Sequence, residues 1–107
     1  MPFYMKTNDT SPALEAVLKD GNGAVVSLIG ASVSFHMRAI GVSDAKVSSS
    51  ATISDAANGV VYYQWQPSDT SEVGSYEGEF EVTYTGGEKE TFPNNRHIEI
   101  EFTEDLG

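Results

Sequence analysis

Two histidines and a series of alternating glutamates are the side chains of this chain that could support acid–base chemistry. His36 and His97 are the only imidazoles in the 107 residues, and neither stands at a catalytic or metal-binding spacing from suitable partners. We expect His36 on the outward register of one strand and His97 at the start of another. Nucleophile motifs, phosphate-cradling glycine loops and the helical zinc-protease signature are absent. The sequence therefore predicts no enzyme, no metal and no cofactor.

The alternating carboxylates are the second candidate. Glycoside hydrolysis needs two acids held a few ångströms apart, and five glutamates recur at every second position of two segments: Glu77, Glu79, Glu81, Glu99 and Glu101. Side chains two residues apart on a strand point the same way, so alternation favours a solvated acidic sheet face over catalysis. Calcium is also disfavoured, because Asp55, Asn58 and Asp69 lack dense loop spacing. An acidic face suits a basic partner.

The composition limits the partners and the compartment. Sixteen acidic against six basic residues leave a formal charge of −10, which disfavours nucleic acid and anionic membrane surfaces. No cysteine is present, so no disulfide contributes to stability. The first ten residues show no leader, and no segment reaches the length of a membrane span. We expect one domain over residues 1–107, soluble and made without secretion.

Alternation of apolar and polar residues in short runs between turn residues predicts a meandering β-structure. Seven or eight strands are expected among segments 3–7, 13–19, 24–28, 32–38, 46–54, 60–65, 74–84, 88–92 and 97–103. Asp-Gly followed by Asn-Gly at 20–23 predicts a tight reversal. The count favours an all-β, antiparallel Ig-like β-sandwich, with a barrel as the competing closure. A short helix over 13–19 is a second reading of that stretch.

The inward-facing set follows from the same alternation. It comprises Val33, Phe35, Met37, Val61, Tyr63, Trp65, Tyr76, Gly78, Phe80, Val82, Tyr84, Ile98, Ile100 and Phe102.

A polar crossing between two of these strands predicts a structural corner. It is formed by Trp65, Asp69, Thr70, Gly74 and Tyr76. In Ig-like sandwiches a tyrosine hydroxyl at such a corner bonds back to the backbone. We expect Tyr76 to pack its ring inward and to satisfy its hydroxyl locally, and Asp69 to accept bonds from nearby backbone amides.

Three stretches together resemble a known family. They are NDTSPALEAVLKDGNGAVVSLIGASVSFHMR at 8–38, ISDAANGVVYYQWQPSDTSEVGSYEGEFEVTY at 53–84 and ETFPNNRHIEIEF at 90–102. The ordered turn, the L-x-G-A-x-V-x-F-x-M strand, the G-x-V-x-Y-x-W strand, the Gly-x-Tyr corner and the T-F-P turn are similar to those of the N-terminal domain of phage baseplate upper proteins. This resemblance covers most of the chain.

The resemblance implies an Ig-like module of a phage or prophage virion, assembled in the bacterial cytoplasm. Its expected partners are other tail or baseplate proteins and further copies of itself. Family members carry receptor-binding parts in later segments. The chain stops at residue 107, so we expect a minor tail protein or connector. Two alternatives stay open: a capsid decoration or head protein, and a module that binds carbohydrate or a cell surface. The second would use Tyr62, Tyr63, Trp65 and Tyr84, and an exposed Trp65 would favour it; we expect Trp65 to be buried.

Overall fold

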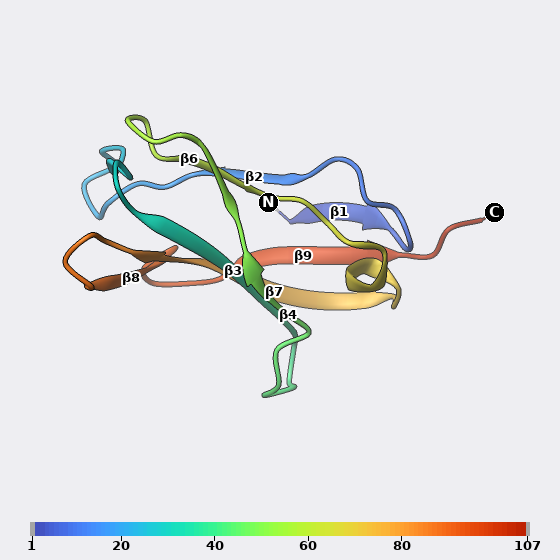
Figure 1. Cartoon of the computed structure of the whole chain (residues 1–107). Coiled ribbons are helices and arrows are strands. Elements are labelled where there is room, and N and C mark those ends of the chain that lie inside the picture. The colour runs from blue at the N-terminus through green and yellow to red at the C-terminus, as the bar shows by residue number, and fades with distance from the viewer. Residues whose placement is uncertain (1, 107) are drawn as a thin grey trace.

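The computed structural model describes residues 2–106, and its regular structure is almost entirely β-strand (Figure 1). Residues 1 and 107 of the predicted domain lie outside this range. The described elements are β1 (Phe3–Lys6), β2 (Leu14–Val17), β3 (Ser32–Ala39), β4 (Val47–Ser50), β5 (Thr52–Asp55), β6 (Val60–Tyr63), the 3-10 turn η1 (Pro67–Thr70), β7 (Gly74–Thr83), β8 (Lys89–Phe92) and β9 (Ile98–Thr103). Across these residues no helix is long and apolar enough to cross a bilayer.

The strands form two sheets that face each other across an apolar interior. The larger sheet has the order β1-β9-β7-β3-β4, with β8 also paired to β7, and the smaller sheet has the order β2-β6-β5. The predicted all-β sandwich is confirmed. Two details differ: the described chain has nine strands, and β1 runs parallel to β9, so the sandwich is not wholly antiparallel. Only hairpin neighbours are forced to be antiparallel, and β1 is far from β9 in sequence.

The extra strand arises where one serine-rich segment divides between the sheets. We predicted a single strand over 46–54, but β4 pairs with β3 and β5 pairs with β6. The chain crosses between the sheets at Ala51, whose N–H donates to the Val33 carbonyl at 2.9 Å. This crossing closes one side of the sandwich.

The segment 24–28 is not a strand, contrary to expectation. The predicted reversal before it is present, since Asp20 Oδ1 accepts bonds from the N–H groups of Asn22 and Ala24 at 2.9 and 3.1 Å. Beyond the turn only an isolated bridge forms, between Lys19 and Val25. The backbone of the following residues bonds to different segments in turn, so no ladder can extend. The helical reading of 13–19 is also wrong, because residues 14–17 form β2.

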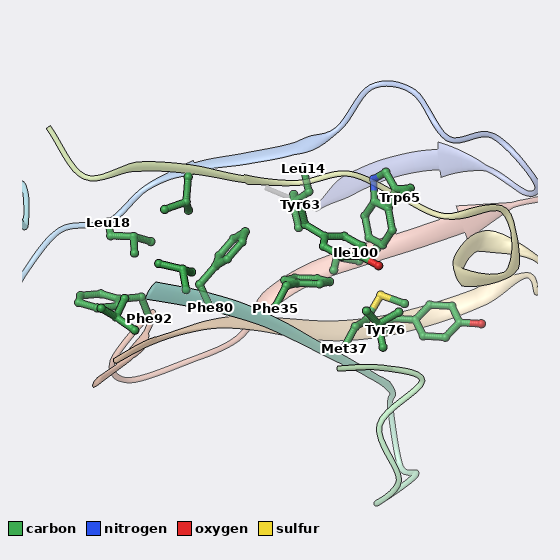
Figure 2. Packing of buried hydrophobic residues seen from close by; sticks show 14 of the residues in the cluster. Leu14, Leu18, Phe35, Met37, Tyr63, Trp65, Tyr76, Phe80, Phe92 and Ile100 are labelled. Carbon is green, nitrogen blue, oxygen red and sulfur yellow. The ribbon is translucent and has the colours of Figure 1, made fainter. Parts of the chain in front are cut away.

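The predicted inward faces make up the centre of the core. Phe35, Val61, Phe80, Val82 and Ile100 are fully buried. Figure 2 shows side chains from the two layers converging between the sheets. Among residues 2–106 the buried hydrophobic side chains are those of Met5, Leu14, Leu18, Leu28, Val33, Phe35, Met37, Val47, Val61, Tyr63, Trp65, Tyr76, Phe80, Val82, Phe92, Ile100 and Phe102. Only Tyr84 and Ile98 of the predicted apolar side chains are half-buried.

Gly78 lies where the two sheets leave no room for a side chain. A Cβ atom there would approach Phe35 Cε1 and Cζ to 3.0 Å and Ile100 Cδ1 to 2.9 Å. Phe35 packs its ring against Tyr63 of the opposite sheet, with centroids 4.7 Å apart. The missing side chain at Gly78 therefore gives the Phe35 ring room to lie across β7.

Candidate functional site

The corner before β7 holds Tyr76 through its ring and its hydroxyl. Tyr76 is buried, and its ring packs on Phe102 with centroids 5.0 Å apart. Its hydroxyl donates to the backbone carbonyl of Glu72 at 2.9 Å. Burial raises the pKa of Tyr76, and the negative charge of Glu72 raises it further. Gly74 opens the strand at φ 155°, and the hydroxyl of Tyr76 spans the turn that precedes it.

Asp69 connects this crossing to the smaller sheet. Its Oδ2 accepts a bond from the Gln66 N–H at 2.8 Å and another from the Tyr63 hydroxyl at 2.6 Å. Burial raises the pKa of Tyr63, and the hydrogen bond to Asp69 adds to the effect. Both contacts go to one oxygen, so Asp69 fixes η1 against the end of β6. The alternating pattern identified Tyr63 as inward but gave no sign that its hydroxyl reaches Asp69.

Thr70 connects the same crossing to the N-terminal part of the chain. Its side chain is fully buried, and Oγ1 donates to the Asp9 carbonyl at 2.8 Å. The Thr70 carbonyl in turn accepts from the Asn8 N–H at 3.0 Å. The loop after β1 is therefore held by a residue more than sixty positions later in the chain, which no local pattern could reveal.

Trp65 lies in the core beneath the corner, as predicted. It is 1% exposed, and its indole packs edge-on against Tyr63 and Phe102, with centroids 5.3 and 5.5 Å apart. Within residues 2–106 its Nε1 has no hydrogen-bond partner. Of the other aromatics considered for sugar binding, Tyr63 is buried, and Tyr62 and Tyr84 are half-buried. None of these four rings forms an exposed stacking platform.

Tyr84 directly follows β7 and is held by a carboxylate. Its hydroxyl donates to Glu90 Oε1 at 2.8 Å. Burial and this hydrogen bond raise the pKa of Tyr84 to about 12. The contact joins the two sides of the β7–β8 hairpin.

The alternating glutamates lie on the outer face of the larger sheet, where the structure adds arginine and histidine side chains that the pattern did not foresee. Arg38 Nε donates to Glu77 Oε1 at 2.7 Å across the β3–β7 pair. His97 Nδ1 lies 3.3 Å from Glu77 Oε2, and its Nε2 lies 3.7 Å from Glu79 Oε1. Farther along the outer face, Ser75 Oγ donates to Glu101 Oε1 at 2.8 Å. Strand pairing, not sequence spacing, brings these groups together.

His36 contributes a second contact to this face. Its Nδ1 lies 2.9 Å from Ser48 Oγ, and its Nε2 lies 3.8 Å from Glu81 Oε1. Serine, imidazole and carboxylate thus stand in the order of a hydrolase triad, but 3.8 Å is too long for the hydrogen bond that orients the base. The neighbouring hollow, near Arg38 and His97, measures about 150 Å³. Across residues 2–106 no group of three or more ligating side chains is arranged to hold a metal ion.

The three residues weighed for calcium do not converge. Asp55 and Asn58 share the turn before β6, where Asn58 Nδ2 donates to Asp55 Oδ2 at 2.9 Å. Asp69 follows β6 at its other end and is occupied by Tyr63 and Gln66.

Two comparisons with known proteins bear on this chain. A search of curated proteins gave no match. A family model described as the BppU N-terminal domain matches residues 3–102, which include both sheets, the corner and the acidic face. The chain therefore belongs to the baseplate upper protein N-terminal domain family, a family of structural domains of the phage tail baseplate.

Proposed function

We propose that this chain is a non-enzymatic component of a phage or prophage tail baseplate and acts through protein–protein contacts. Membership of the baseplate family over residues 3–102 carries the proposal. The side chains around the corner support a structural role: Asp69, Thr70 and Tyr76 direct their polar atoms to other parts of the same chain. In this proposal the corner holds the fold together, and no cofactor is used.

The outer face of the larger sheet is the surface that we assign to a neighbouring subunit. Its glutamates give the sheet a line of negative charge. Arg38 pairs with one of them, Glu77, and the histidines lie within 4 Å of Glu77, Glu79 and Glu81. Charge of this kind directs encounter and register more than it adds affinity. The fitting partner is a basic surface of a tail protein, repeated around the tail by cyclic symmetry.

We also treat residues 1–107 as one domain. The buried side chains of both sheets belong to one cluster, and removing either sheet would expose that cluster to water. This arrangement supports a module that enters the particle as a unit.

The proposal is tested by mass spectrometry of purified virions, combined with immunogold labelling of intact particles. We expect peptides of this chain in the particle and label at the tail end. Label on the head would identify the chain as a capsid protein and contradict a tail location. Particles that lack the chain would contradict the whole proposal.

A charge reversal tests the assigned face. We expect Glu81→Lys to lower incorporation into particles, whereas Glu88→Lys, the same change on the β7–β8 turn, should not. Equal incorporation of both variants would contradict the role assigned to the acidic face as the contact surface. Both purified variants are first checked for wild-type thermal stability.

A further inference from the structure

The outer edge of β2 is uncovered in this sandwich. β2 stands at the end of the sheet order β2-β6-β5. In the Ig arrangement A-B-E-D, the strand at this position is B, and strand A covers its edge. Here the first strand, β1, pairs with β9 of the opposite sheet instead. The smaller sheet is thus left with an edge shaped to accept one more strand.

The hydrogen bonds of Leu18 identify which backbone groups face that edge. The Leu18 N–H donates to the Gly59 carbonyl at 2.8 Å, and its carbonyl accepts from the Val26 N–H at 2.9 Å. Both groups therefore point toward the interior of the sheet. Because direction alternates along a strand, the N–H and C=O groups of Glu15, Val17 and Lys19 point outward. The structure gives these groups no backbone partner within residues 2–106.

The side chains of the same three residues are exposed. Glu15, Val17 and Lys19 share one register and the outer face of the smaller sheet, and Val17 is 46% exposed. In the described chain neither Glu15 nor Lys19 takes part in an ion pair. Natural edges are protected by shortness, charged side chains, proline, bulges or a covering segment. β2 is four residues long and has no proline, and the exposed charges along its edge, at Glu15 and Lys19, are of opposite sign. Opposite charges stand at equal distances on either side of Val17.

We propose that two copies of this chain associate through their β2 edges, antiparallel and related by a two-fold axis at Val17. Val17 then lies opposite the partner's Val17, and Glu15 lies opposite the partner's Lys19. Each outward N–H and C=O of these residues meets its counterpart, which is the ladder of an antiparallel pair. The two smaller sheets become one continuous sheet across the dimer.

Charge explains why a second copy fits this edge. Two chains of −10 repel each other, but the edge carries one carboxylate and one ammonium and has no net charge. The two-fold axis converts this order into two opposite-charge cross-strand pairs. Asp20, the next charged residue, is occupied in its own turn by the Asn22 and Ala24 N–H groups. A groove of about 600 Å³ adjoins the edge, lined by apolar side chains such as Leu18 and Phe92 and by polar ones such as Asn94 and Arg96. The paired strand would extend along it.

Sedimentation equilibrium of the purified chain and of charge variants tests the pairing. We expect a wild-type dimer in the micromolar range. Glu15→Lys and Lys19→Glu each place like charges opposite each other twice, so each should weaken dimerisation about tenfold, which is about 1.4 kcal/mol. Glu15→Lys does this although it lowers the net negative charge. The double variant keeps the net charge and should recover the wild-type dissociation constant.

A backbone variant gives a second reading. Val17→Pro removes an outward N–H that the monomer does not use, so it should abolish dimerisation and keep a wild-type circular dichroism spectrum. If Val17→Pro fails to fold, the dissociation constants of the Glu15 and Lys19 variants still test the pairing. A monomeric wild type overturns the proposal, as does a double variant that dimerises no better than the single ones. Neither result bears on the virion assignment, which is tested on particles.

Discussion

Removing the hydroxyl of Tyr76 tests whether the corner stabilises the sandwich. In Tyr76→Phe the ring keeps its packing on Phe102, so no cavity forms. The change deletes the 2.9 Å bond to the Glu72 carbonyl. Glu72 is exposed, so water can replace the lost donor and hold the cost near the ordinary value for one hydrogen bond, about 1 kcal/mol. For a domain of this size the melting temperature should fall by about 5 °C.

The assay is thermal and urea unfolding, followed by circular dichroism, with Tyr62→Phe as the matched control. Tyr62 is half-buried, and its hydroxyl has no hydrogen bond to the described residues, so the same deletion should cost less than about 0.5 kcal/mol. The urea dependence of the free energy should keep its slope in both variants. Equal stability of Tyr76→Phe and Tyr62→Phe would refute the assigned role of the corner.

Three further outcomes are expected. Gly59→Ala should lower the free energy of unfolding in urea by more than about 2 kcal/mol, because φ is +69° and a Cβ would meet two backbone carbonyl oxygens within 3 Å. Gly87→Ala, at φ +93° with open space around it, should lower it by only about 1 kcal/mol; equal losses of stability in the two variants would contradict this. The fluorescence of Trp65, the only tryptophan, should peak at short wavelength and resist quenching by acrylamide until the protein unfolds, because its side chain is 1% exposed. Added oligosaccharides should leave this emission unchanged, and ready quenching in the native protein would refute its burial. The free energy of unfolding should fall as pH rises above about 10. Tyrosines in the unfolded chain release protons there, while Tyr63 and Tyr84 stay protonated in the native state because their pKa values are raised, that of Tyr84 to about 12. Urea midpoints that stay constant across this pH range would contradict the raised pKa values.

The class of fold and most of the core could be predicted from local sequence patterns. Strand alternation is a local, period-two signal, so Phe35, Val61, Phe80 and Ile100 could be assigned to the interior from their own segments. The turn at 20–23 was also predictable, because its Asp and Gly residues set the backbone directly. The family resemblance depended on the order of such local motifs, and the match over residues 3–102 confirmed it.

Which strands pair and which polar groups meet could not be predicted from local patterns and follow from the folded structure. The parallel β1–β9 pair, the contact of Thr70 with Asp9 and the His97 contacts to Glu77 and Glu79 join segments far apart in the chain. The open edge of β2 is another feature that local patterns do not predict, because β2 is an edge strand only when β1 pairs in the other sheet. Alternation fixes the face on which a side chain lies but not the neighbour beside it. That choice depends on how the two sheets bury their common core.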